Sequence, residues 1–89
     1  MRKENYEFLV SDFHETSHRH SNNLANGLME EAKEVKASEE AGDTEAMLDE
    51  LADCLWYITS MALGEGCSLE KLMKRNIAKL EHRALNGKG

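Results

Sequence analysis

Two pairs of acidic residues have the three-residue spacing that places both members on one face of a helix. Glu31 and Glu34 form the first pair, and Glu50 and Asp53 form the second. Residues three apart on a helix are neighbours, so each pair presents two carboxylates together. Four converging carboxylates repel one another, and holding them away from water is costly unless a cation neutralises them. Hard oxygen ligands suit Mg²⁺, Mn²⁺ or Ca²⁺ rather than Zn²⁺, so the pairs predict a divalent metal site.

The segments that carry the two pairs can form a helical hairpin. A short turn, from about Ala41 to Thr44, separates them. Within it, Gly42 suits the left-handed position after a helix, and Asp43 or Thr44 can cap the next helix. Apolar residues recur at helical spacing in four segments. We therefore expect helices over residues 3 to about 20, 24–41, 45–63 and 69–84, followed by a frayed tail.

The position of Glu31 distinguishes it from an ordinary surface acid. At about 100° per residue, Leu24, Leu28, Glu31 and Val35 fall within one sector roughly 60° wide. Glu31 therefore lies inside the apolar stripe of its helix, and Glu34 lies at the margin. A solvated acid belongs outside such a stripe, so this position favours a functional role.

The third and fourth segments have distinct faces. The third carries two parallel apolar rows, which predicts contacts with more than one neighbour. The heptad-like seam contains Leu48, Leu51, Leu55, Ile58 and Ala62, and the second row contains Met47, Cys54 and Met61. In the fourth segment, Asn76, Lys79 and Arg83 recur at i, i+3 and i+7 and form a polar, cationic edge.

Composition indicates one small acidic domain, spanning residues 1–89. The net charge is −6; residues 30–53 hold most of the acids, so no basic face for a nucleic acid is expected. Such a short chain buries a modest core, and we expect oligomerisation to extend it. No apolar run of membrane-spanning length and no signal-peptide pattern is present, so we expect a cytoplasmic protein. Cys54 and Cys67 lack zinc or redox spacing and are expected to be free thiols.

The motifs together resemble a known family. The run from Gly27 to Val35 reads GLMEEAKEV, and the run from Glu50 to Tyr57 reads ELADCLWY. Their order, ExxE, a spacer and ExxD, resembles that of the MazG-type nucleotide pyrophosphohydrolases in the all-α NTP pyrophosphatase superfamily. The later stretches Gly66-x-Ser68-Leu69-Glu70 and Asn76-x-x-Lys79-Leu80-x-x-Arg83 are similar to the family's downstream helix. The resemblance covers residues 23–83, most of the chain.

The resemblance implies an all-α, four-helix-bundle-like fold whose site lies between helices and is completed by oligomerisation, as a homodimer or homotetramer. It implies Mg²⁺-dependent hydrolysis of a nucleoside triphosphate to the monophosphate and pyrophosphate, with Mn²⁺ as a possible substitute, and a role in nucleotide-pool cleaning. The metal ligands would be Glu31, Glu34, Glu50 and Asp53. Glu34 or Glu31 would serve in catalysis by holding the attacking water or accepting its proton. The residues that would bind substrate are Tyr57, Asn76, Lys79 and Arg83 at the phosphates, and Asn23 and Trp56 at the base or sugar.

Other interpretations remain open. Taken alone, each acid pair or the polar edge of the fourth segment fits a solvated helix face, and Trp56 fits a core or subunit interface equally well. The chain could be a non-catalytic helical oligomer, or a superfamily member directed at dUTP or phosphoribosyl-ATP. Residues 14–18 read HETSH, the zincin pattern H-E-x-x-H, but no third ligand is evident. A surface cluster of His14, His18 and His20 explains this pattern more simply.

Overall fold

The computed structural model describes the backbone of residues 3–16 and 23–86, and the side chains of residues 5–12 and 23–86. These residues form helices and turns without any strand: α1 (Lys3–Thr16), α2 (Leu24–Ala41), α3 (Thr44–Gly64) and α4 (Leu69–Leu85). The predicted all-α fold is confirmed. The second, third and fourth helices begin and end within one residue of the predicted positions, and the predicted continuation of α1 to about residue 20 lies outside the described residues.

Local capping signals explain where α3 and α4 begin. Gly42 follows α2 with a φ of 74°, a left-handed conformation that glycine adopts without steric cost. The Asp43 side chain accepts a hydrogen bond of 3.1 Å from the N–H of Ala46, and α3 starts there. The Ser68 hydroxyl likewise accepts from the N–H of Lys71, at 3.2 Å, at the start of α4. Both caps are the ones that the sequence predicts.

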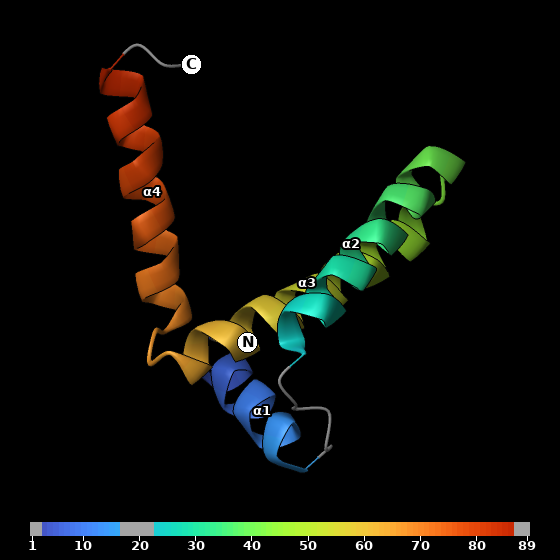
Figure 1. Cartoon of the computed structure of the whole chain (residues 1–89), viewed down its shortest axis with the longest axis horizontal. Helices are drawn as coiled ribbons and strands as arrows, with labels where there is room; N and C mark the ends of the chain where they lie inside the picture. Colours follow the sequence, from blue (N-terminus) through green and yellow to red (C-terminus); the bar gives the residue numbers. More distant parts are fainter. Residues whose placement is uncertain (1–2, 17–22, 87–89) are drawn as a thin grey trace.

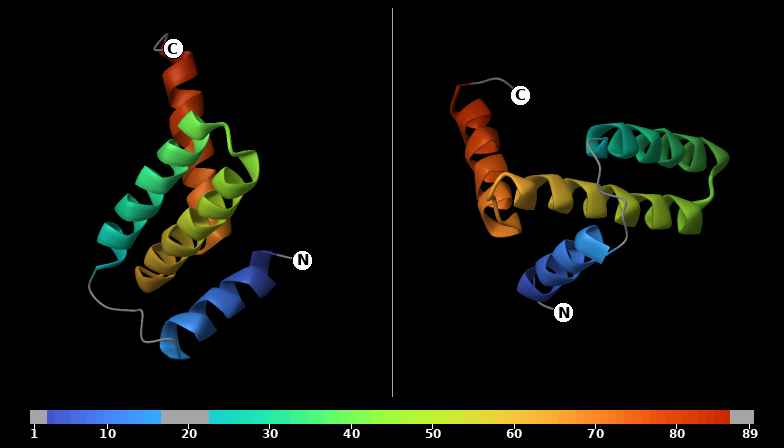
Figure 2. Two further views of the ribbon diagram at one scale, coloured as in Figure 1. Left: turned by 90° about the vertical axis from the view of Figure 1, so that its right-hand side faces the viewer. Right: turned by 60° about the horizontal axis from the view of Figure 1, so that its bottom comes forward.

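The other three helices are arranged around α3 (Figure 1). α2 and α3 lie side by side as an antiparallel hairpin, and α1 packs against α3 nearer its C-terminal half (Figure 2). α4 turns away at the end of α3 that is farther from the hairpin tip. Within the described residues α4 contacts α3 and α1 but not α2. The hairpin is therefore the unit that positions the acidic residues.

The buried core is small and lies between α1 and α3. Among the residues with described side chains, those classed as buried are Val10, Thr59 and Ser60, at 1%, 0% and 6% exposure. These residues belong to α1 and α3, which contact each other. No described helix is long and apolar enough to cross a lipid bilayer.

The two apolar rows of α3 have different environments. The row of Met47, Cys54 and Met61 is half-buried. The seam beside it is open, with Leu48, Leu51, Leu55 and Ile58 between 36% and 52% exposed. On α4 a second open row contains Met73, Ile77 and Leu80, at 44% to 53% exposure. A single chain thus leaves a large part of its apolar surface uncovered.

Candidate metal centre between α2 and α3

Three of the four predicted acids meet between α2 and α3. Glu31 comes from α2, and Glu50 and Asp53 come from α3. Each offers a carboxylate oxygen, and these three oxygens all lie within 4.8 Å of one another. Glu31 and Glu50 are half-buried and Asp53 is exposed, so the group is open to solvent on the side of Asp53.

Glu34 borders this group of three. It lies one turn beyond Glu31 on α2, and its side chain is exposed. A hydrogen bond with Glu34 raises the pKa of Glu50, with smaller contributions from burial and from the charges of Glu34, Asp53 and Asp49. Glu34 therefore lies within hydrogen-bonding reach of Glu50 at the edge of the group.

The surroundings of Glu31 disfavour its ionised form, and a nearby positive charge would stabilise it. The pKa of Glu31 is raised to about 6, most strongly by burial, with contributions from the charges of Glu34, Asp53 and Glu50 and from a hydrogen bond with Asp53. Its Oε1 atom is buried and has no hydrogen-bond partner. An unsatisfied buried carboxylate oxygen is costly, and a cation would satisfy it. The donor set, all carboxylate oxygen, fits a hard divalent ion such as Mg²⁺.

A close contact between Gly27 and Tyr57 forms the layer next to the acids. Gly27 lies one turn before Glu31, and Tyr57 lies one turn after Asp53. A Cβ atom on Gly27 would come within 2.4 Å of the Tyr57 ring carbon Cε1 and 2.8 Å of the hydroxyl oxygen. The phenol therefore lies directly against the backbone of α2. Glycine at this position lets the two helices approach closely.

Two further predicted substrate residues lie near this end of α2 and α3. The Trp56 ring packs edge-to-face on Tyr57, with centroids 5.0 Å apart and an interplanar angle of 90°. Asn23 precedes α2, and its side chain accepts a hydrogen bond of 3.2 Å from Asn26 instead of capping the helix. Asn23 is eight residues from Glu31, ~12 Å along a helix axis, so it is not adjacent to the acids.

The cationic edge of α4 is not placed beside the acids within one chain. Asn76, Lys79 and Arg83 are all exposed, on a helix that does not contact α2. Figure 2 shows α4 directed away from the hairpin. The predicted neighbourhood of phosphate-binding and metal-binding residues is therefore absent from the single described chain.

The zincin-like pattern falls largely outside the described part of the chain. His14 and Glu15 belong to α1, but their side chains are not described, and His18 and His20 lie outside the described residues altogether. The arrangement of this histidine cluster stays a prediction.

Two neighbours of the acids were not predicted as site residues. Burial raises the pKa of Tyr6, and the charge of Asp53 contributes, so the phenol of an α1 residue lies near the cluster. Burial also raises the pKa of Cys54, followed by the charges of Glu31, Asp53 and Glu50. The sequence pattern places Cys54 in an apolar row of the third segment and gives no site signal for Tyr6. The close packing at Gly27 could have been predicted from the sequence, because glycine inside a helix lowers its stability and usually has a packing reason.

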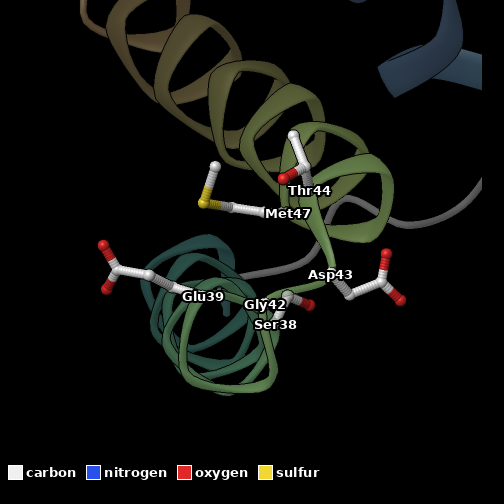
Figure 3. Close-up of a pocket in the computed structure, with 6 residues that line it drawn as sticks. All are labelled: Ser38, Glu39, Gly42, Asp43, Thr44 and Met47. Atoms are coloured by element: carbon white, nitrogen blue, oxygen red, sulfur yellow. The ribbon is translucent and has the colours of Figure 1, made fainter.

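A shallow hollow lies at the hairpin tip (Figure 3). Its lining residues are Ser38, Glu39, Gly42, Asp43, Thr44 and Met47. None of the predicted site residues is among them. The hollow therefore lies apart from the acids, which are nearer the middle of the hairpin.

We expect Gly27→Ala to destabilise the protein by ~1–3 kcal/mol, because the new methyl group overlaps the Tyr57 ring. In the background of Tyr57→Ala the same substitution should become neutral or stabilising by up to ~1 kcal/mol, because alanine is the better helix former. Urea unfolding of the four proteins measures both effects. An equal cost in both backgrounds would contradict the contact.

We expect the metal-free protein to lose stability as pH rises through the range set by Glu31. Its pKa is about 6 in the folded chain against 4.5 for the free side chain. The folded state therefore binds more protons, and this contribution is fully present below pH 4.5 and lost above pH 6. Without metal, the free energy of unfolding of Glu31→Gln should be higher than that of the wild type by on the order of 1 kcal/mol at pH 7.5, a value reduced for solvent screening. At pH 4 the two free energies should be equal.

Unfolding in the presence of a chelator, followed by Trp56 fluorescence at each pH, measures this difference. Glu39→Gln removes an exposed acid elsewhere on α2 and keeps Glu31, so this matched control should follow the wild type in its stability at both pH values. A Glu31→Gln variant that is less stable than the wild type at pH 7.5 without metal would contradict the electrostatic account.

Comparison with known protein families gives one match, and it covers most of the chain. Residues 19–87 match the MazG nucleotide pyrophosphohydrolase domain. The match includes α2, α3 and α4, and with them all four acids. No curated protein and no solved structure shows significant similarity to the chain.

Proposed function

The chain belongs to the MazG nucleotide pyrophosphohydrolase family, and from that premise we propose that it hydrolyses a nucleoside triphosphate to the monophosphate and pyrophosphate with Mg²⁺. The observation that carries this proposal is the meeting of Glu31, Glu50 and Asp53 between two helices. Triphosphate hydrolysis needs divalent charge beside the phosphates, and this group is suited to hold it. Mn²⁺ has similar ligand preferences and is expected to substitute.

The acids divide into holding and proton-accepting roles in this proposal. Glu31, Glu50 and Asp53 would hold the metal, with Glu34 at the border of the group. When bound, Mg²⁺ supplies positive charge that offsets the charge developing on the phosphate oxygens. Glu34 is exposed beside the group and can hold a water or accept its proton. Glu31 is the second candidate for that role.

The phosphates would be bound by the cationic edge of α4. Arg83 can make two parallel hydrogen bonds to phosphate oxygens, and Lys79 supplies a point charge. Asn76 would add a hydrogen bond. Because α4 of the same chain is directed away from the acids, α4 of a second copy would bring these residues to the site. The proposed enzyme is therefore a homodimer or homotetramer.

The open apolar rows support self-association. The α3 seam and the α4 row remain exposed in the single chain, and burying apolar surface is the main favourable term in association. Charge supports the same pairing: residues 24–64 carry ten acids and two lysines, whereas residues 69–86 carry five Lys or Arg and two acids. An α4 docked beside a second hairpin would bring opposite charges together.

The base and sugar would lie towards Tyr57 and Trp56. These rings form a half-buried aromatic pair one turn from Asp53, and aromatic faces stack on nucleobases. Tyr57 can donate its hydroxyl hydrogen to a phosphate or sugar oxygen, and Asn23 lies farther along at the start of α2. The proposed role is removal of surplus or noncanonical nucleotides in the cytoplasm, where free thiols such as Cys54 and Cys67 persist.

We expect the purified protein with Mg²⁺ to release pyrophosphate, and not orthophosphate, from at least one member of a panel of nucleoside triphosphates. The panel should include dUTP and phosphoribosyl-ATP, because hydrolysis of one of these alone would identify an enzyme with a narrow substrate range. Asp53→Asn and Glu34→Gln should each lower kcat/KM by at least ~100-fold, because each removes a charge from the proposed centre.

Glu40→Gln is the matched control, since Glu40 lies on α2 and pairs with Lys36 at 2.9 Å outside the acid group. It should retain full activity. Absence of turnover across the panel, with Asp53→Asn more stable than the wild type, would instead favour a non-catalytic helical oligomer.

We expect the wild type to sediment as a dimer or tetramer of the 10.1 kDa chain and Leu55→Lys to shift it to monomer. Leu55 lies in the open seam of α3 at 43% exposure, and a buried ammonium group there would be strongly unfavourable. Leu85→Lys is the control, because Leu85 lies at the end of α4 and is 87% exposed. A wild type that sediments at monomer mass at micromolar concentration would contradict the proposed assembly.

A further inference from the structure

One side chain of α1 reaches the first residue of α4. The Glu7 Oε2 atom accepts a hydrogen bond from the backbone N–H of Leu69, and the pair is partly buried. The two residues are 62 positions apart in the sequence. The N–H of Leu69 is one of the four that a helix start leaves without a partner inside the helix. Glu7 satisfies it, and a carboxylate at a helix N-terminus is also favoured by the helix dipole.

This contact lies at the connection between α3 and α4, which sets the direction of α4. Cys67, Ser68, Leu69 and Leu72 are half-buried, but every residue from Met73 to Asn86 is exposed. Gly66, with a φ of 73°, turns the chain just before this point. Packing within the described chain therefore holds α4 only at its first turn. Figure 1 shows the rest of α4 extending away from the other helices.

A small rotation at the first turn moves the far end of α4 by a large distance. At 1.5 Å per residue, Lys79 lies ~15 Å and Arg83 ~21 Å beyond Leu69. A tilt of about 10° at Leu69 would displace Arg83 by ~4 Å, more than the length of a hydrogen bond. Displacements of 1 Å are enough to impair a positioned catalytic or binding group.

We propose that Glu7 is a positioning residue: by accepting the Leu69 N–H it fixes the direction in which α4 leaves α3, and thereby places Lys79 and Arg83. The second half of this inference rests on the proposed function, in which α4 binds the phosphates. The first half does not, because it concerns a contact within one chain. Phe8 and Leu9, exposed neighbours of Glu7 on α1, have apolar side chains that cannot accept this hydrogen bond, so the role belongs to Glu7 itself.

The direct test is amide hydrogen exchange of the full-length protein, followed by NMR. Glu7→Ala removes the acceptor, and Glu7→Asp shortens the side chain by one carbon. Both should speed exchange of the Leu69 amide by at least ~10-fold and leave amides in the middle of α2 and α3 unchanged. Glu7→Gln keeps an acceptor oxygen at the same reach and should restore protection.

Glu70→Ala is the matched control. Glu70 is also an acid in the first turn of α4, but it pairs with Lys74 of the same helix at 3.3 Å. Its loss removes the same charge from the helix start without touching the contact with α1, so Leu69 should stay protected.

The second readout is the kinetics of pyrophosphate release. Glu7→Ala and Glu7→Asp should raise KM by ~5-fold or more with kcat within ~2-fold of the wild type, because phosphate contacts are lost while the acids are unchanged. Glu7→Gln should recover the wild-type KM. A general loss of structure would lower the active fraction and kcat instead.

The two readouts separate the two proposals. If the wild type turns over no nucleotide, the proposed function fails, and hydrogen exchange alone decides whether Glu7 holds α4. Equal protection of Leu69 in the wild type, Glu7→Ala and Glu7→Asp would overturn the inference. Failure of Glu7→Gln to restore protection, or faster exchange throughout all helices, would also overturn it. Faster exchange at Leu69 with an unchanged KM would show that the contact does not place Lys79 and Arg83.

Discussion

Mutual repulsion among the carboxylates between α2 and α3 is the constraint on which the rest of the structure depends. Glu31, Glu50 and Asp53 offer oxygens within 4.8 Å of one another, with Glu34 at the border. The raised pKa values of Glu31 and Glu50 indicate that the folded chain resists carrying all of these charges together. The hairpin must therefore be held by other contacts, and a divalent cation would convert this unfavourable arrangement into a favourable one.

The contacts that hold the hairpin lie on either side of the acids. At the tip, Gly42 and the Asp43 cap reverse the chain within two residues. Beyond the acids, Gly27 admits the ring of Tyr57 against the α2 backbone. The acids lie between these two layers, so their spacing is set by helix geometry and not by attraction between them. This arrangement resembles preorganised sites in which rigid elements hold the ligands.

Much of the hairpin could be predicted from the sequence because its determinants are local. Helix ends follow from Gly42, Asp43 and Ser68, and membership of the MazG family follows from the order of the two acid pairs. The face on which the acids meet was predictable because Glu31 lies inside an apolar stripe. The parts that sequence reasoning missed, the direction of α4 and the approach of Tyr6 to Asp53, depend on how helices cross, and helical periodicity does not encode crossing angles.

The two-residue connection between α2 and α3 also has a consequence for how the chain folds. Glu31 and Asp53 are separated by only 22 positions in the sequence, and α2 and α3, which carry all four acids, pack on each other. Contacts of low sequence separation require little loop-closure entropy and form rapidly. The hairpin is thus expected to be an early kinetic intermediate or nucleus. The carboxylates would then converge while α1, which returns across a longer connection, is still undocked, so cation binding could accelerate folding as well as stabilise its product.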